Sequence, residues 1–521
     1  MKRQDLILAA GLAFLFTMFM QYYFSPQQSN EPAASGQRVV APKVVEPALN
    51  QPLFTEIDFK DAKGGTFKIT TVETEHARYE FSTRGGTLQQ VQFRRPFGGK
   101  SYFMSTLAVP NVHEHERLSF IVALAEKTPL AYELVSQDKN DEKHTLVYKA
   151  PLDGDGAITK TFVVYTHTYR IDCTVAVTRA DWHGKTEQPR LFFASPLIAD
   201  LANNDAITGI ANSGKHKVQS IPKKEDSFNA YWARPTLFGA QDRYFVHALV
   251  HDADHFAQRG YFKSIDLERM YAILEGPTIV ENKTWTLSFY FGPKEDEALQ
   301  AVDPRLEYTL NYGWFSFLSK PLSKMLLHAL NWINKYVHNY GWSLIIISLV
   351  FRILLFPFTY EPRTKNEKKR AEYQRKLEYI QQKYKHDPQQ LAQERMELMR
   401  THGLPGLGGC VVSLIQLPMF WATSIILANA VELYRAPFLW VDDLSSPDKY
   451  YILPLIAAFG FMIHIATTAA PDTRQRISSL VIAVVAGAIL TNVASGFLLC
   501  VLVSTYAGVV QAVITQRRKV A

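Results

Sequence analysis

Five long apolar segments fill the last third of this 521-residue chain, and they constrain its fold more than any other feature. Each is long enough for an α-helix to cross the hydrocarbon core of a bilayer. A sixth apolar run, residues 6–24, follows Lys2 and Arg3, and no small-residue cleavage site follows it. We therefore expect residues 1–24 to be an uncleaved anchor rather than a signal peptide. The five later segments are residues 341–359, 410–430, 451–470, 477–493 and 495–515.

The charges between these segments predict one orientation, because loops rich in Lys and Arg stay in the cytoplasm. Residues 363–402 carry eleven Lys and Arg against six Asp and Glu, which places this loop inside. The loop 431–450 is acidic and is expected outside, and Arg517, Arg518 and Lys519 end the chain inside. An arrangement of six spans agrees with the charge of every loop. In this arrangement both termini are cytoplasmic, and the segment after the anchor lies on the outer side.

Residues 54–305 show short runs of alternating polarity, which predict a β-sandwich outside the membrane. In one run Ile171, Cys173 and Val175 share a face, and in another Trp285 and Leu287 do. A segment rich in Pro, Gln, Ser and Ala, residues 25–53, precedes this region and is typical of a flexible linker. We see no internal repeat.

Two further helical patterns adjoin the first of the five spans. Residues 312–339 have an apolar stripe opposite a basic one, which favours a helix lying in the membrane interface over one that packs between domains. The basic loop 363–402 is predicted to form a helical hairpin, whose second helix is capped by Asp387, starts at Pro388 and ends at Gly403. Its charge fits either a solvated orientation signal or a landing surface for anionic lipid, RNA or a nascent chain.

The sequence contains no convincing motif for a metal site, a phosphate-binding loop or a catalytic site. The three cysteines have no zinc spacing, and His113 and His115 lack a third ligand at useful spacing. The stretch FGGKS is similar to a phosphate loop, but Arg94 stands where its first glycine belongs. We therefore predict no catalytic residues, no metal, no cofactor and no nucleotide, and hence no enzyme.

The segment GWSLIIISLVFRILLFPF contains a charge, Arg352, eleven residues from its outer end. At 1.5 Å per residue this is about 15 Å deep, close to the bilayer midplane, where a charge is costly. No apolar segment contains a carboxylate that could pair with it, so we expect water or a client group around Arg352 rather than a structural ion pair. His464, in a later segment, is expected to serve helix packing.

The chain contains the stretches STRGGTLQQVQF, DRYFVHAL, YGWFSFLSKPL, GWSLIIISLVFR, LGGC, IQLPMF and YYILP. These stretches closely resemble the YidC family of bacterial membrane protein insertases, of the Gram-negative type with a large periplasmic domain. The resemblance covers nearly the whole chain in the expected order. It implies an anchor, a periplasmic β-supersandwich at 54–305, an interfacial helix at 312–339 and a five-span α-helical insertase core at 341–521 that includes a cytoplasmic helical hairpin.

The resemblance also implies the site and the partners. In this family the spans enclose a hydrophilic groove that receives nascent membrane proteins. The expected partners are membrane lipids, the ribosome and the Sec translocon, in the bacterial inner membrane. The family's tyrosine pair in the last span is replaced by Cys500 and Val501. The groove maps to Arg352, Ser348 and Phe420. Gln416 is a further candidate for the groove wall, with a helix–helix hydrogen bond as the alternative. Docking on the basic hairpin is expected at Lys368, Lys369, Arg370, Arg375 and Lys376.

Two other classes of protein remain open at this point. A transporter or channel with a periplasmic sensing domain predicts inverted repeats, and we find no repeat. A membrane-anchored enzyme acting on envelope polymers predicts a cluster of acid–base or metal-binding residues in the β region, which the sequence does not show.

Overall fold

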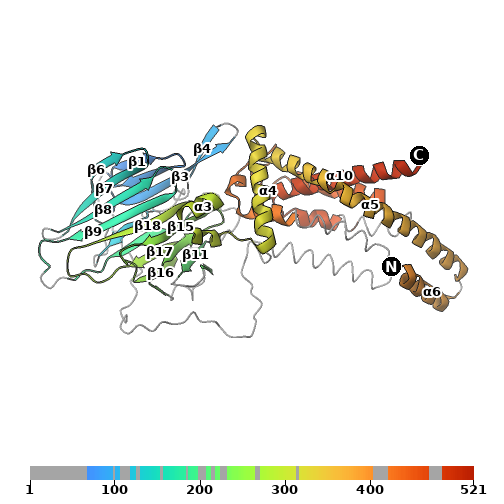
Figure 1. Ribbon diagram of the computed structural model, residues 1–521, viewed down its shortest axis with the longest axis horizontal. Helices are drawn as coiled ribbons and strands as arrows, with labels where there is room; N and C mark the ends of the chain where they lie inside the picture. The colour runs from blue at the N-terminus through green and yellow to red at the C-terminus, as the bar shows by residue number, and fades with distance from the viewer. Residues whose placement is uncertain are drawn as a thin grey trace. The chain divides into compact units, whose positions relative to one another are not determined.

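In a computed structural model the chain consists of two compact units, and the boundary between them lies between Asn311 and Tyr312 (Figure 1). The first unit consists mainly of β-sheets and the second of helices. The expected anchor and linker, residues 1–53, lie outside the described residues. The structure describes residues 67–520 except 98–99, 106–117, 125–129, 153–155, 183–185, 197–206, 213–217, 223–230, 265–269, 313–315, 386, 403–419, 469–480 and 482–483.

A nine-stranded antiparallel sheet is the base of the first unit. Its strand order is β12-β11-β14-β15-β18-β9-β8-β7-β6, and the register shifts between β15 and β18 and between β6 and β7. The strands are β6 (Glu133–Lys139), β7 (Lys143–Leu152), β8 (Gly156–Tyr165), β9 (Arg170–Thr178), β11 (Thr208–Asn212), β12 (Gln219–Pro222), β14 (Leu237–Gln241), β15 (Phe245–Asp252) and β18 (Lys283–Pro293).

Two smaller antiparallel sheets accompany it. One has the order β1-β2-β3-β4, with β1 (Ile69–Glu73), β2 (Ala77–Ser82), β3 (Thr87–Phe97) and β4 (Lys100–Ser105). The other has the order β13-β16-β17-β10-β5, with β5 (Ile121–Ala123), β10 (Arg190–Ala194), β13 (Trp232–Ala233), β16 (Arg259–Ser264) and β17 (Met270–Glu275).

Aromatic side chains join the sheets into a sandwich. Phe81 of β2 lies 4.9 Å from Phe162 of β8, ring centre to ring centre, and Phe193 of β10 lies 5.3 Å from Phe289 of β18. Both small sheets thus pack on the nine-stranded sheet. The predicted alternation is confirmed here, because the apolar faces of β9 and β18 are buried, at Ile171, Cys173, Val175, Trp285 and Leu287.

Lys160, a fully buried lysine on β8, ties these layers together. Its ammonium donates hydrogen bonds to the carbonyls of Gly85 (2.6 Å), Gly86 (3.2 Å) and Phe120 (2.7 Å) and lies 4.6 Å from the centre of the Tyr132 ring. The three acceptor residues have positive φ angles of 68°, 53° and 68°. The ammonium therefore donates hydrogen bonds to buried carbonyls of residues whose backbone is in the left-handed region.

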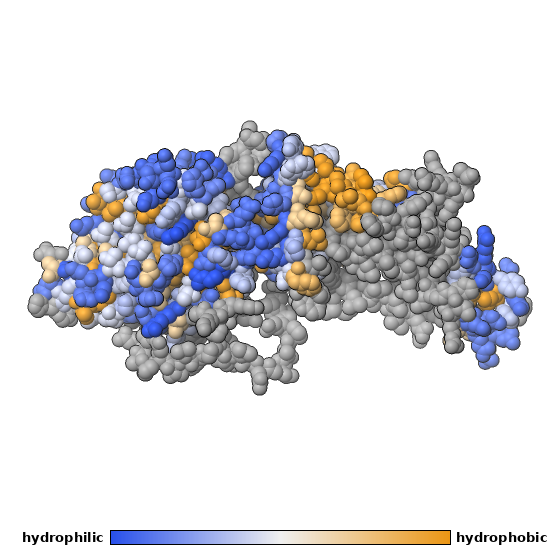
Figure 2. All heavy atoms as spheres, viewed as in Figure 1, coloured by the Kyte–Doolittle hydropathy of each residue, from blue (hydrophilic) through white to orange (hydrophobic). Residues whose placement is uncertain are grey.

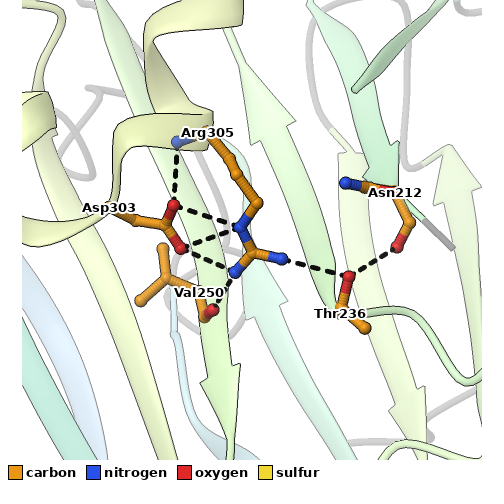
Figure 3. Close-up of polar contacts among 5 residues, drawn as sticks. All are labelled: Asn212, Thr236, Val250, Asp303 and Arg305. Carbon is orange, nitrogen blue, oxygen red and sulfur yellow. Dashed lines mark hydrogen bonds and ion pairs between the residues drawn. The ribbon is translucent and has the colours of Figure 1, made fainter. Parts of the chain in front are cut away.

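The C-terminal end of the first unit is fixed by Arg305 (Figure 3). Two short helices, α3 (Asp296–Val302) and η2 (Pro304–Thr309), follow the last strand. From η2 the Arg305 guanidinium donates to the Asp303 carboxylate, to Thr236 Oγ1 (3.1 Å) and to the Val250 carbonyl. These bonds join η2 to the nine-stranded sheet.

The second unit is built from helices that pack on one another: α4 against α5, and α10 against both α5 and α8. None of the helices in the part of the chain that is described combines the length and the apolar composition needed to cross a membrane. The labelled helices are α4 (Ser316–Val337), α5 (Tyr340–Lys383), α6 (Pro388–His402), the short η3 (Val431–Leu433), α8 (Ile452–Thr468) and α10 (Ser495–Val520), and residues 420–429 and 484–490 are also helical.

Helix α5 is continuous through residues 359–363, where the sequence suggested a boundary between span and hairpin. Its 44 residues correspond to about 66 Å at the usual rise. Helix α6 follows and packs against α5, and the Tyr384 hydroxyl donates to Glu394 (3.2 Å). The predicted Asp387 cap is confirmed, because its carboxylate accepts from the amides of Gln389 and Gln390.

Helix α5 has two different faces in its first half. Ser348 and Arg352 are buried, whereas the residues between and after them include exposed apolar side chains. Figure 2 shows hydrophobic surface over this part of the helical unit. The exposed apolar residues on α5 include Leu349, Val350, Ile353, Leu354 and Phe356, and α8 adds Leu455, Ile456 and Phe459.

Candidate functional site

The candidate site begins at the N-terminus of α5, which is firmly fixed. The Asn339 side chain caps the helix by accepting from the amides of Gly341 (2.9 Å) and Trp342 (3.3 Å). The Phe438 ring packs directly on Gly341, where any Cβ would clash with it, and lies edge-on to Trp342 at 5.4 Å between ring centres. Gly341 thus permits the close approach of the 431–451 loop.

Two aspartates organise that loop. Asp443 accepts from the amides of Arg435 and Ser445, and Asp448 accepts from the amides of Tyr450 and Leu453. The same loop is bonded to the start of α10 through backbone hydrogen bonds of 2.8 Å. The acidic residues that suggested an outside loop therefore also hold the backbone of that loop in place through hydrogen bonds.

Arg352 is the centre of the site and is only 9% exposed. Its Nη2 donates to Oε1 of Gln511 on α10, at 3.4 Å. The expectation of water or a client group around this charge is therefore incomplete, because a neutral amide of the chain itself contacts it. Sequence reasoning missed Gln511, although a glutamine inside the last apolar segment was a visible signal.

Gly508, one turn before Gln511, brings a third helix to the site. A Cβ built on Gly508 would lie 3.3 Å from Arg352 Nη2 and 3.4 Å from Cε1 of His464 on α8. His464 therefore shares the surroundings of the arginine. Nearby, the Tyr506 hydroxyl donates to the Ile456 carbonyl (3.2 Å) and joins α10 to α8.

Ser348, one turn before Arg352, faces a different part of α10. The Cys500 thiol lies against the hydroxyls of Ser348 and of Thr423, which belongs to the 420–429 helix. The cysteine that replaces the expected tyrosine is therefore fully buried where three helices meet. Small polar groups, instead of an aromatic ring, fill this position.

Phe420 belongs to the helical segment 420–429 and lies 5.5 Å from Phe497 of α10, ring centre to ring centre. Phe497 precedes Cys500 by one turn, so Phe420 and Ser348 both contact the first turns of α10. Gln416, the remaining predicted groove residue, lies outside the described residues. The structure thus brings Ser348 and Phe420 to one end of α10 and Arg352 to a level farther along that helix.

The basic residues predicted for docking are partly visible. Arg375 and Lys376 are exposed on the C-terminal half of α5. The side chains of Lys368, Lys369 and Arg370 lie outside the described residues, and so does the pair of histidines at positions 113 and 115. Among the residues that the structure describes, no group of His, Cys, Asp and Glu is arranged to hold a metal ion.

Comparisons with known proteins match both units. The model of the YidC periplasmic domain matches residues 69–325, and the model of the 60Kd inner membrane protein matches residues 332–521. A membrane protein insertase YidC of Geobacter sulfurreducens is 26% identical over 83% of each chain. One of Geobacter metallireducens is 27% identical over 98% of this chain and 97% of the relative. A crystal structure of an active YidC insertase is 16% identical, covers 98% of this chain and 99% of its own, and has a TM-score of 0.38.

The β-sandwich unit thus matches a periplasmic domain, and the helical unit matches an inner membrane protein. The chain belongs to the YidC family of membrane protein insertases, and its first unit matches the periplasmic domain of that family. The resemblance seen in the sequence is confirmed.

Proposed function

We propose that this chain inserts membrane-protein segments through a polar site centred on Arg352. The observation that carries the proposal is that Arg352 is buried and that its Nη2 contacts a neutral glutamine. The contact with a neutral amide does not itself neutralise the guanidinium, and a charge in surroundings of low dielectric attracts anionic groups strongly. The relatives of this chain are named membrane protein insertases.

The insertion step follows from the two faces of α5. The polar flank of a client segment is held at Arg352, which shortens the path of that flank through hydrocarbon. The apolar part of the client then moves into lipid beside the exposed apolar face of the helix. Its burial yields about 25 cal/mol per Å² and drives the step without nucleotide, cofactor or bond cleavage. The protein therefore acts as an insertase and chaperone and not as an enzyme.

We further propose the topology that the charge pattern predicts, with six spans, cytoplasmic termini and the β unit in the periplasm. In this orientation the membrane potential assists an acidic flank moving outward by about 2.3 kcal/mol per charge and 100 mV. Helix α4 then lies in the membrane interface. Its exposed Phe317, Met325, Trp332 and Tyr336 support this placement, since aromatic side chains favour the headgroup region.

Partners follow from the surfaces near the site. Arg375 and Lys376 are exposed on α5. With Lys368, Lys369 and Arg370 they are proposed as a basic surface for the ribosome, the nascent chain or anionic lipid. The Sec translocon is proposed as a second partner, with which the chain helps clients to fold. Further walls of the groove are proposed at Ser348, Gln416 and Phe420.

Reversing the charge of Arg352 tests the proposal. The full chain and Arg352→Glu are reconstituted in phosphatidylethanolamine and phosphatidylglycerol vesicles that contain no other translocase. Protease protection of a single-span client with an acidic outer flank is measured. We expect insertion to fall about tenfold or more, since attraction becomes repulsion. Lys139→Glu, which makes the same charge change on an exposed position of β6, is the control and should insert normally.

Equal insertion by Arg352→Glu and the wild type would overturn the electrostatic role of Arg352. The alternative function, that of a transporter or channel with a periplasmic sensing domain, is tested in the same vesicles. A transporter or channel would give a substrate-dependent ion flux, which an insertase does not require.

A further inference from the structure

The 431–451 loop holds several side chains in an unfavourable backbone conformation. Arg435, Leu439 and Tyr451 have φ angles of 52°, 54° and 58°, in the left-handed region that favours glycine. All three side chains are exposed. Such residues persist only where the surrounding structure fixes them, and they gather at functional sites.

Leu439 stands at the tip of a tight turn. Phe438 and Val441 exchange two backbone hydrogen bonds, of 2.8 and 2.9 Å, around Leu439 and Trp440. Turns with two central residues favour glycine where the first of them has a positive φ. The side chain of Leu439 is 69% exposed, so it contributes little to the core of the helical unit. A leucine at this position therefore needs a contact outside the chain to be favourable.

The turn is held rigidly, and its indole has a polar partner within the chain. Trp440 Nε1 donates to Oδ2 of the buried Asp448, at 3.3 Å. The ring can therefore enter a less polar environment without leaving its N–H group unpaired. Asn339 Nδ2 donates to the Pro437 carbonyl (3.3 Å), which joins the turn to the start of α5.

The exposed apolar surface of the helical unit continues onto this loop. Residues 332–521 match an inner membrane protein, so the exposed apolar side chains of α5 and α8 face lipid. Tyr450 and Tyr451 are exposed immediately before α8, and the exposed Trp342 near the start of α5 contacts Phe438 of the turn. Trp and Tyr side chains favour the headgroup region of a bilayer.

We propose that the 438–441 turn inserts into the headgroup region of the bilayer and thereby fixes the 431–451 loop to the membrane. Leu439 reaches the boundary between the headgroups and the acyl chains, and Trp440 lies beside it. The partner is a phospholipid surface and not a client segment or a second protein. The proposal goes beyond the proposed function, because it concerns how the helical unit is held in lipid and makes no use of Arg352.

The depth of position 439 is the first test. Leu439→Cys in the full chain is labelled with the fluorophore NBD and reconstituted in phosphatidylethanolamine and phosphatidylglycerol vesicles, with and without lipid that carries a doxyl quencher near its headgroup. Asp141→Cys, at an exposed position between β6 and β7, is the control, and the labelled wild type gives the background from the native cysteines. We expect quenching at position 439 to be about threefold stronger or more.

The strained backbone gives a second test. Leu439→Gly relieves the strain but removes the apolar side chain, so in vesicles the Val441 amide should exchange its hydrogen about threefold faster or more. His255→Gly is the matched control, since His255 is exposed on the β unit and has a φ angle of 53°. There the same relief involves no lipid, and the amide of Phe256 should exchange as in the wild type or more slowly.

Either measurement can overturn the proposal. Equal quenching by doxyl lipid at positions 439 and 141 would place the turn in water or against protein. An exchange rate in Leu439→Gly that is unchanged or slower would mean that the leucine makes no contact with lipid. Neither measurement uses a client, so failure of insertion site Arg352 in its own test leaves this proposal unaffected.

Discussion

Arg352 and Gln511 are 159 residues apart in the chain and are joined by a hydrogen bond of 3.4 Å between Nη2 and Oε1. The bond is long for a charged donor, so the amide orients the guanidinium without neutralising it. This contact differs from an ion pair, in which a carboxylate of the chain would already occupy the arginine.

Replacing the amide by a carboxylate should therefore occupy the site from within. In Gln511→Glu the new carboxylate pairs with Arg352, and we expect insertion of clients with acidic flanks to fall about fivefold or more while neutral clients insert as before. Protease protection in vesicles measures both. Gln390→Glu, at an exposed position of α6, is the control. Normal insertion of acidic clients by Gln511→Glu would mean that Arg352 does not hold them.

Lys160 should be essential to the packing of the β unit. Lys160→Met leaves buried carbonyls without their donor, and we expect the free energy of unfolding to fall by about 2–4 kcal/mol. Urea unfolding of the full chain in detergent, read by proteolysis of the β unit, gives the difference. Lys149→Met, at an exposed position of β7, should change this free energy by less than about 0.5 kcal/mol. Equal urea midpoints for the two variants would contradict the role of the buried ammonium.

His247 of β15 should make the β unit sensitive to acid. Its ring is fully buried, stacks on Phe291 at 4.3 Å between ring centres and bonds the Ala194 carbonyl through Nδ1 (3.0 Å). Burial lowers the pKa of His247 to about 3, from an ordinary value of 6.5. The unfolded chain therefore binds the proton first, and stability that is fully present above pH 6.5 is lost as the pH falls toward 3.

At about pH 5 this histidine alone should cost about 2 kcal/mol of folding free energy. The urea midpoint of the full chain, measured at several pH values, checks the slope. His247→Phe should be less stable near neutral pH but should show a weaker acid dependence than the wild type. His251→Gln, at an exposed position of the same strand, should keep the slope of the wild type. Identical slopes for His247→Phe and the wild type would show that this ring does not titrate on unfolding.

The sequence predicted the parts of this fold that depend on local patterns. The alternation along β9 and β18 indicated which side chains are buried, and Asp387 followed by Pro388 indicated the start of α6, because both depend on neighbours in the chain. Arg352 was found because a charge within an apolar segment is costly wherever the segment packs.

The partners of Arg352 could not be predicted in the same way. Gln511 contacts it, and His464 lies beside the same glycine, only through the packing of α5, α8 and α10, and no local pattern gives the rotation of one helix against another. Gly508 is informative only once its neighbours are known. Asp443 and Asp448 were interpreted through their charge alone, so their hydrogen bonds to the loop backbone were missed.

Helix α5 carries both Arg352 and the exposed basic residue Arg375 on one unbroken rod. The two positions are about 35 Å apart along the axis. A partner bound at Arg375 and a client flank held at Arg352 would therefore be attached to one and the same helix.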